Sequence, residues 1–375
     1  MNDYRPRGEV ELAKIVARAA AECRGLRVIG GGTRAVLDGV AGDPLRTDGL
    51  AGIRLYEPAA LTLVVGVGTP VSEVVHLLEA EGQRLPFEPM DHRGLTGSTG
   101  TPTIGGVVAA NVSGPRRVQA GACRDSLIGV RFVDGTGAVV KNGGRVMKNV
   151  TGYDLCKLMA GSFGTLGVLT EVAFKLLPAP AAAATLTLRG LDDRTAVQAM
   201  AAALTSPFEV SAAAHGPDTW LRLEGFEEQV SYRAARLTER LAPFGVVEVE
   251  RDPQAVAAHW AGIRDVAAFH GRPGDVWRVS VKPSDGPEVA ARAGAQAVLY
   301  DWGGGLVWLL MPADTDLRAR LGDLPGHATL IRASAATRAR IAPFAPEPAP
   351  VAALSAALRA RFDPRGILNP GLMAS

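Results

Sequence analysis

The chain has 375 residues, of which 47% are hydrophobic and 21% are charged, so it can bury a large core and is long enough for two or three domains. Forty basic residues nearly balance thirty-eight acidic ones, and no Lys/Arg block carries interleaved aromatic residues, which argues against a nucleic-acid partner. There is no apolar run of about eighteen residues and no signal-peptide core at the N-terminus. We therefore expect a cytoplasmic protein without a transmembrane helix.

The cysteines and histidines are scattered. Cys23, Cys123 and Cys156 lie far apart without a Cys-x-x-Cys pair, which argues against a zinc site, an iron–sulfur cluster or a disulfide framework. The six histidines show no metal-ligand spacing either: His76, His92, His215, His259, His270 and His327. The sequence therefore predicts no metal site and fits a reducing compartment.

The chain begins with the pattern of a helix, a strand and a glycine turn. Apolar residues recur at helical spacing over residues 12–23, and LRVIG, residues 26–30, reads as a buried strand. Residues 30–35 match a loose G-x-G-x-x-A dinucleotide fingerprint, which requires a helix immediately afterwards. Two glycines and a proline within residues 39–44 exclude that helix, so we interpret residues 35–44 as turn and loop and discard an NAD-binding Rossmann fold. The glycines remain either a tight turn or an anion-binding nest of backbone amides.

An α/β pattern continues along the chain. Residues 60–70 read as a strand, 71–82 as a helix and 83–89 as a strand. Residues 129–140 read as a hairpin with an Asp-Gly turn.

Two further loops within this pattern are rich in small residues. TPTIGGVVAANVSGPRR, residues 101–117, combines glycines that allow close approach of a ligand with neutral Thr, Asn and Ser donors. Residues 161–167 place three glycines between a helix ending near Ala160 and a strand starting near Val168. Three such loops in one region suggest an extended ligand, such as a dinucleotide, held mostly by backbone groups.

Four stretches together carry a resemblance to a known family: VIGGGTR (28–34), PTIGGVVAANVSGPRR (102–117), KNVTGYDLCKLMAGSFGTLGVLTEV (148–172) and RFDPRGILNPG (361–371). With them the chain resembles the FAD-binding subunits of bacterial glycolate oxidases, within the vanillyl-alcohol-oxidase or p-cresol-methylhydroxylase-type flavoproteins. The resemblance covers residues 8–178 and 350–371, whereas the middle of the chain matches only faintly.

The resemblance implies an FAD site. Pyrophosphate contacts would come from Gly30, Gly31, Gly32, Thr33, Arg34, Thr103, Ile104, Gly105 and Gly106, with Asn111, Ser113 and Gly114 nearby. The adenosine end would lie against Gly164, Gly167 and Val168, and Asn369 would reach the flavin ring. Members often attach FAD through a histidine in or beside the first glycine loop. Because GGGTR contains neither His nor Cys, we expect dissociable FAD, with His92 in EPMDHRG keeping covalent attachment open.

The second half of the chain has a different pattern. A Pro/Ala-rich run over residues 176–186 marks a domain boundary, and residues 184–251 read as β-α-β-β-α-β, the order of a ferredoxin-like unit. After a helix at residues 253–269, the same order recurs over residues 277–334. A Pro-rich run, residues 342–350, leads to a helix ending near Phe362 and a turn-rich end.

These patterns and the resemblance predict an α+β fold. A p-cresol-methylhydroxylase-type FAD-binding domain of two α/β subdomains would occupy residues 1–178. A cap or substrate domain of two ferredoxin-like units would occupy residues 183–342, and residues 350–375 would return to the flavin domain.

Oxidation of a hydroxy acid on a flavin requires a cation for the carboxylate and a group that takes the hydroxyl proton. Arg278 in VWRVSVKP is the candidate carboxylate clamp, the alternative being a salt bridge between domains. Related catalytic subunits carry a His-rich, Gly-Asp-Gly-Asn-type motif in this half, and the nearest local pattern is YDWGGGLVWL, residues 300–309. The expected base is therefore missing.

The resemblance then implies an FAD-binding subunit of a complex that oxidises glycolate to glyoxylate. Its partners would be a larger FAD-containing catalytic subunit and an iron–sulfur subunit that passes electrons to quinone, with membrane association only through the complex. Trp302 and Trp308 would be either interface anchors or core residues. Two alternatives remain: a self-sufficient FAD-dependent oxidoreductase acting on another hydroxy acid or alcohol, and a structural subunit with a vestigial FAD pocket.

Overall fold

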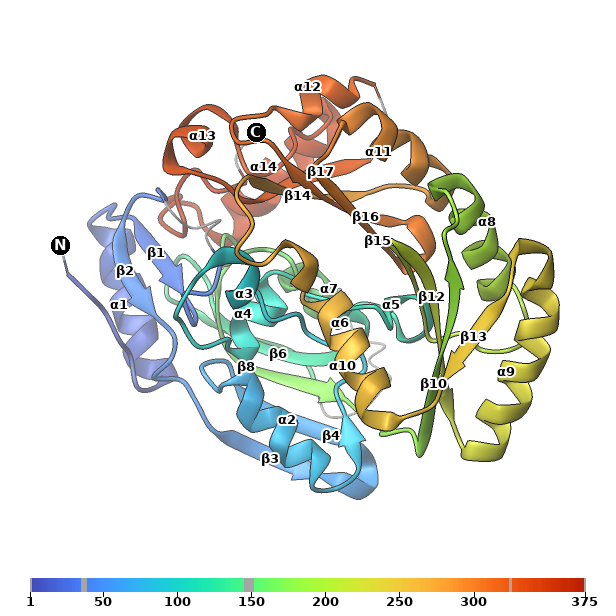
Figure 1. The fold of residues 1–375 in the computed structure, drawn as a ribbon. Helices are drawn as coiled ribbons and strands as arrows, with labels where there is room; N and C mark the ends of the chain where they lie inside the picture. Colours follow the sequence, from blue (N-terminus) through green and yellow to red (C-terminus); the bar gives the residue numbers. More distant parts are fainter. Residues whose placement is uncertain (1, 35–38, 145–151, 324–325, 374–375) are drawn as a thin grey trace.

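The computed structural model describes residues 2–34, 39–144, 152–323 and 326–373. The fold is α+β and contains two large sheets (Figure 1). Among the described residues, no helix combines the length and the apolar character needed to cross a membrane.

The first half of the chain forms a small parallel sheet and a five-stranded antiparallel sheet. The small sheet pairs β1 (Leu26–Ile29) with β2 (Asp43–Arg46), next to α1 (Glu9–Ala21). The larger sheet has the order β3 (Ile53–Glu57), β4 (Thr62–Gly66), β8 (Val168–Lys175), β6 (Leu127–Val133) and β7 (Val139–Gly143). The remaining elements are α2 (Val71–Glu79), β5 (Gln83–Arg84), α3 (Arg93–Thr96), α4 (Ile104–Ala109), α5 (Arg117–Ala120), α6 (Cys123–Ser126), α7 (Leu155–Met159) and β9 (Leu177–Pro178).

The second half forms one eight-stranded antiparallel sheet with the order β13-β10-β12-β11-β15-β16-β14-β17. Its first four strands are β10 (Ala182–Arg189), β11 (Ala212–His215), β12 (Asp218–Gly225) and β13 (Val247–Glu250). The others are β14 (Asp275–Ser280), β15 (Ala297–Asp301), β16 (Leu306–Met311) and β17 (His327–Arg332). The helices are α8 (Asp193–Leu204), α9 (Glu227–Leu241), α10 (Pro253–Arg264), α11 (Gly286–Ala293), α12 (Leu317–Leu321), α13 (Ala335–Arg340) and α14 (Ala349–Phe362).

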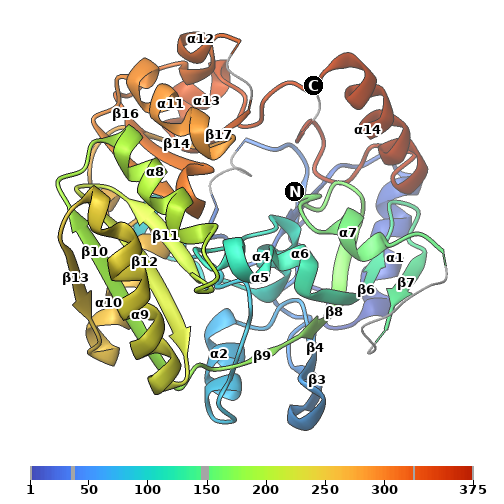
Figure 2. The ribbon, with the colours of Figure 1, turned by 90° about the vertical axis from the view of Figure 1, so that its right-hand side faces the viewer.

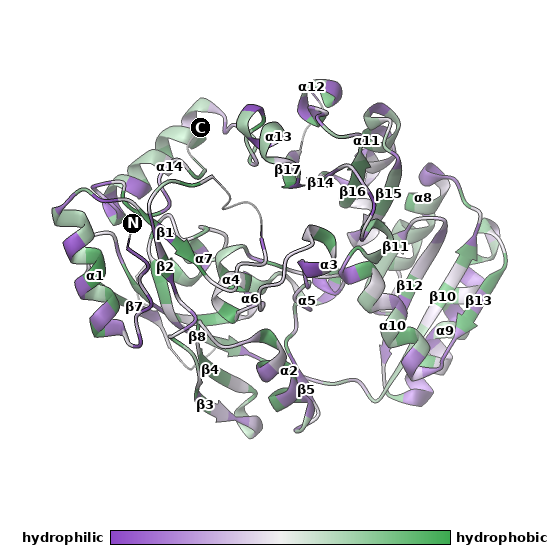
Figure 3. Cartoon of the chain, turned by 60° about the vertical axis from the view of Figure 1, so that its left-hand side comes forward, coloured by the Kyte–Doolittle hydropathy of each residue, from purple (hydrophilic) through white to green (hydrophobic). Residues whose placement is uncertain are grey.

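Each half of this sheet follows the β-α-β-β-α-β order that the sequence predicts, and the two halves join through a bridge between His215 on β11 and Tyr300 on β15. Side chains alternate between the two faces, as they do in any strand. On β14, Trp277 packs in the outer core formed with α8, α9, α11 and α12, whereas Arg278 points to the inner face. On β16, Trp308 belongs to the inner core that also contains the five-stranded sheet. Figure 3 shows apolar strands running through both sheets.

The C-terminal segment returns to the first sheet. Helix α14 ends at Phe362, as the sequence predicts, on the same side of the molecule as α1 (Figure 2). The Leu26 amide then donates to the Ile367 carbonyl at 2.7 Å, and the Asn369 amide donates to the Leu26 carbonyl at 2.9 Å. These residues extend the small sheet beyond β1.

Some local predictions were wrong. The strand expected over residues 83–89 is limited to Gln83–Arg84. The loop expected over residues 101–117 contains helix α4, which begins at Ile104 because the Thr103 hydroxyl caps it by accepting from the Gly106 amide. The loop expected over residues 35–44 ends in strand β2, and residues 35–38 lie outside the described part of the chain.

Candidate cofactor and substrate site

A first cavity of about 80 Å³ lies where the loop after β1 meets α4 and the turn before β8. Ten of the residues proposed from the sequence line it: Gly30, Gly31, Gly32, Thr33, Arg34, Thr103, Gly105, Gly106, Gly164 and Gly167. The three glycine loops, which are far apart in the sequence, are therefore brought together around one space.

The first loop has to be glycine because backbone runs against backbone there. A Cβ on Gly31 would lie 1.6 Å from the Thr101 carbonyl oxygen, and a Cβ on Gly30 would lie 2.8 Å from the Thr103 hydroxyl. Gly32 has a φ of +66°, in the left-handed region that glycine adopts without strain. No hydrogen bond joins the amides of Gly31, Gly32 or Thr33 to another described residue. These amides form the kind of backbone concavity that binds anions.

Arg34 lines this cavity and also the next one. Its Nη1 donates to the Gly106 carbonyl at 2.8 Å, and its Nε is buried without a hydrogen-bond partner among the described residues. Burial lowers the pKa of Arg34 to about 10, so the guanidinium stays charged at neutral pH. A cation beside free amides fits a phosphate or pyrophosphate group.

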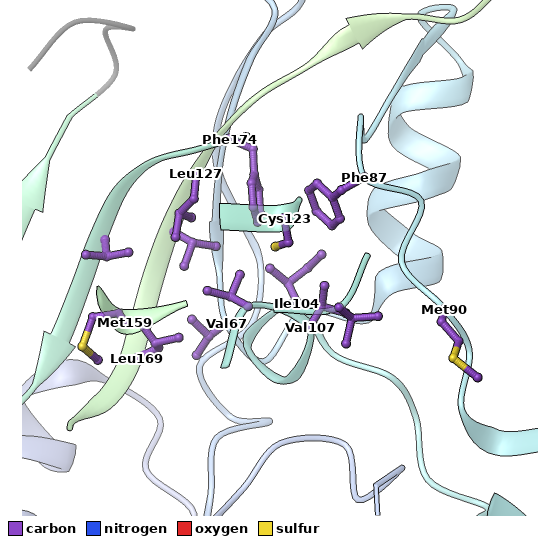
Figure 4. Close-up of a cluster of buried hydrophobic side chains, with 14 of the residues drawn as sticks. Val67, Phe87, Met90, Ile104, Val107, Cys123, Leu127, Met159, Leu169 and Phe174 are labelled. Atoms are coloured by element: carbon purple, nitrogen blue, oxygen red, sulfur yellow. The ribbon is translucent and has the colours of Figure 1, made fainter. Parts of the chain in front are cut away.

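Three of the proposed FAD residues lie away from both cavities. Ile104 and Val168 are buried in the apolar core, where Ile104 packs in the same cluster as Phe87 and Cys123 (Figure 4). Asn369 is also buried, and both ends of its amide are engaged: Oδ1 accepts from the Val28 amide and Nδ2 donates to the Phe163 carbonyl, each at 2.7 Å. In this arrangement Asn369 holds two cavity-forming backbone segments together.

A second cavity of about 280 Å³ separates the inner face of the eight-stranded sheet from the segment that precedes β6. The other three proposed residues, Asn111, Ser113 and Gly114, line this cavity. Its charged or titratable lining residues are Arg34, His92, Arg117, Arg264, Arg278 and Asp301. Its apolar lining includes Met90, Phe163, Leu306, Trp308, Ile331 and Phe344, so the space is apolar with a strong excess of cations.

Arg278 faces this cavity. Its guanidinium carbon lies 5.0 Å from the centre of the Trp302 ring, and the side chain makes no hydrogen bond or ion pair with a described residue. Burial lowers the pKa of Arg278 to about 10, which leaves it charged at neutral pH. Arg117 lies over the same ring at 4.4 Å. The salt bridge offered as the alternative role of Arg278 is therefore not found within the described part of the chain.

Two further titratable residues line this cavity: Asp301, which the sequence-based site did not include, and His92, which the sequence offered only as a point of covalent attachment. Asp301 is 3% exposed, and burial raises the pKa of its carboxyl to about 7. His92 is also buried, and burial together with the charge of Arg34 lowers its pKa to about 3. Asp301 belongs to YDWGGGLVWL, residues 300–309. This run is the nearest pattern in the sequence to the motif of catalytic subunits, although it lacks the expected histidines.

A buried cluster of charges connects the first half of the chain to strand β12. Arg222 of β12 donates to both carboxylate oxygens of Glu88 at 2.9 Å. Glu224, also on β12, accepts from Arg84 at 2.8 Å and from Arg116 at 2.5 Å. The cluster joins strand β12 of the eight-stranded sheet to the first half of the chain, including Arg116 in the second small-residue loop, residues 101–117.

Known proteins resemble this chain both in sequence and in fold. The family described as FAD binding domain matches residues 4–143. The structure titled alkyldihydroxyacetonephosphate synthase superposes with a TM-score of 0.70 at 14% identity, covering 98% of this chain and 76% of that one. The chain thus has the fold of that structure, with a match to the FAD binding domain over residues 4–143.

Relatives with higher sequence identity show to which protein family the chain belongs. Glycolate oxidase subunit GlcE of Escherichia coli (strain K12) is 37% identical over 325 residues, covering 86% of this chain and 84% of that protein. Glycolate oxidase subunit GlcD of Bacillus subtilis (strain 168) is 36% identical over 120 residues, 32% of this chain and 24% of that protein. The chain belongs to the GlcE family of glycolate oxidase subunits.

Proposed function

We propose that the chain binds FAD non-covalently as a subunit of a complex that oxidises a 2-hydroxy acid, glycolate, to glyoxylate. The observation that carries the proposal is the junction at Arg34, where a glycine-lined cavity with free amides meets an arginine-lined cavity under the eight-stranded sheet. A dinucleotide phosphate suits the first space and a small carboxylate suits the second.

The roles of the residues follow from that junction. The amides of Gly31, Gly32 and Thr33, with Arg34, would hold the pyrophosphate. Bound FAD would supply the two-electron acceptor. Arg278 would hold the substrate carboxylate by charge-assisted hydrogen bonds, while Trp308 and neighbouring apolar side chains exclude water.

The wider assignment rests on the relatives, whose names describe glycolate oxidase subunits. The partners would be an FAD-containing catalytic subunit and an iron–sulfur subunit, which would pass electrons to quinone. The protein would be cytoplasmic and would reach the membrane only through these partners. We divide the chain into an FAD-binding domain, residues 1–178, a cap domain, residues 183–342, and a returning segment, residues 350–375.

The proposal is tested by filling the first cavity. Gly106 lies in helix α4, and a Cβ there would meet only the end of Arg34 at 3.0 Å and the Thr103 hydroxyl at 3.4 Å. Gly106→Leu should therefore keep the helix, because leucine is a better helix former than glycine, and should obstruct FAD. Gly262→Leu on α10 is the matched control, since its nearest contact is Ala267 at 3.9 Å.

The measurement is FAD binding to the purified chain, followed by quenching of flavin fluorescence. We expect Gly106→Leu to weaken FAD binding by at least about tenfold at unchanged thermal stability, and Gly262→Leu to bind as the wild type does. Equal FAD affinity in Gly106→Leu would place the cofactor elsewhere. Assembly and activity that persist in the complex after Gly106→Leu has lost FAD would favour the structural subunit with a vestigial pocket.

Acid precipitation of the FAD-loaded chain tests whether FAD is covalently attached to it. Non-covalent FAD should remain in the supernatant after the chain is precipitated. Flavin that sediments with the chain, but not with a His92→Gln variant, would instead identify His92 as an attachment site.

A further inference from the structure

The turn between β15 and β16 has an unusual backbone. Trp302 has a φ of +54°, followed by Gly303 at +68° and Gly304 at +101°. A bulky residue in the left-handed region is strained and persists only where its surroundings hold it. Here the Asp301 carboxylate accepts from the Trp302 amide at 2.7 Å, and the Trp302 indole donates to the Gly114 carbonyl at 3.0 Å.

This turn presents a carboxyl group and a cation to the same cavity. Asp301 and Arg278 both line the second cavity, and they form no ion pair with each other. One oxygen of Asp301 is bonded to the Trp302 amide, while the other makes no hydrogen bond or ion pair with a described residue. The Trp302 ring supports Arg278 at 5.0 Å. One cavity therefore contains a carboxyl oxygen and a guanidinium that both lack a partner among the described residues.

We propose that Asp301 accepts the hydroxyl proton of a 2-hydroxy acid whose carboxylate is held by Arg278, so that this chain carries a substrate-oxidising site of its own. This inference rests on the proposed function, because it needs a bound flavin as oxidant. The O–H proton of the substrate would move to Asp301 as its C2–H bond breaks and a C=O bond forms, and bound oxidised flavin would supply the acceptor of the C2–H electron pair and hydrogen. Two electrons leave the substrate, and the protonated carboxyl later returns its proton to water.

The other titratable group of the cavity is a much weaker base. Burial and the charge of Arg34 lower the pKa of His92 to about 3, whereas burial raises that of Asp301 to about 7, so His92 is the weaker base of the two. The charged groups that act on Asp301 are Glu88, which raises its pKa, and Arg222 and Arg278, which lower it, while burial is the largest influence. A base with a pKa near neutrality suits proton abstraction at physiological pH.

The test uses the full chain loaded with FAD and two measurements. The first is the rate at which flavin absorbance bleaches after anaerobic mixing with glycolate or another 2-hydroxy acid at pH 8. The second is binding of oxalate, an unreactive dianion, by calorimetry. We expect Asp301→Asn to slow bleaching by about a hundredfold or more and to bind oxalate at least as tightly, because a negative charge near Arg278 is removed. Arg278→Met should lose both the bleaching of flavin by the 2-hydroxy acid and the binding of oxalate.

A buried carboxyl outside the cavities serves as the control. Asp275 on β14 is 2% exposed, and burial raises its pKa as well. Asp275→Asn should leave bleaching and oxalate binding at wild-type levels. The infrared band of a protonated carboxyl that titrates near pH 7 should be lost in Asp301→Asn and kept in Asp275→Asn.

The outcomes separate this inference from the proposed function. Bleaching at the wild-type rate by Asp301→Asn, or a wild-type flavin that no 2-hydroxy acid bleaches, would overturn the role of Asp301 and leave the FAD-binding assignment standing. Failure of the wild-type chain to bind FAD would overturn the proposed function itself.

Discussion

The buried charge cluster around Glu224 should contribute strongly to stability, and the contribution should depend on pH. The side chain of Glu224 is 8% exposed and lies within 4 Å of Arg84, Arg116 and Arg222. We expect Glu224→Gln to destabilise the protein because it leaves these arginines with fewer countercharges.

The magnitude follows from the pKa of Glu224. Burial alone would raise this pKa, but the charges of Arg222, Arg116 and Arg84 prevail and lower it from 4.5 to about 2. A difference of about 2.5 pH units corresponds to roughly 3 kcal/mol of unfolding free energy. Because the folded-state pKa is the lower one, this stability is present above pH 4.5 and is lost as the pH falls toward 2.

Urea unfolding of the FAD-free chain at pH 7, 5, 4 and 3, followed by tryptophan fluorescence, measures this contribution. The gap between the wild type and Glu224→Gln should be about 3 kcal/mol at pH 7 and should shrink below pH 4.5. Glu248→Gln is the control, because Glu248 pairs with Arg189 on the surface and its loss should leave the midpoint nearly unchanged. An equal midpoint for Glu224→Gln at pH 7, or a gap that stays constant down to pH 3, would refute the reasoning.

Two further predictions concern the first half of the chain. Asn369→Leu should destabilise the protein by about 2–4 kcal/mol and weaken FAD binding, because the part-buried Val28 amide and Phe163 carbonyl lose their partners. Urea unfolding and a flavin titration measure these effects, and unchanged values for both would contradict the role given to Asn369. The native chain should react with one equivalent of a thiol reagent, at the exposed Cys23, and the unfolded chain with three, because Cys123 and Cys156 are buried and burial raises the pKa of each thiol. Rapid labelling of two or more thiols in the native chain would show that this packing is wrong.

Short-range patterns predicted the elements well. The strand and helix patterns read in chain order led to the β-α-β-β-α-β order of residues 184–251 and 277–334, which the structure has. Local patterns failed at Ile104, because a loop rich in glycine and a capped helix look alike until the Thr103 hydroxyl is placed over the Gly106 amide.

The sequence by itself determined the three small-residue loops, the strands and helices around them and the resemblance to FAD-binding subunits, because these depend on neighbouring residues. Only the tertiary structure decided which side chains meet in a cavity. Asn369 bonds Val28 from 341 residues away, and Asp301, next to a strained turn that no periodicity encodes, lines the same cavity as Arg34. Such contacts depend on how the eight-stranded sheet packs over the first half of the chain, and burial in that packing sets the pKa of each charged group in the site.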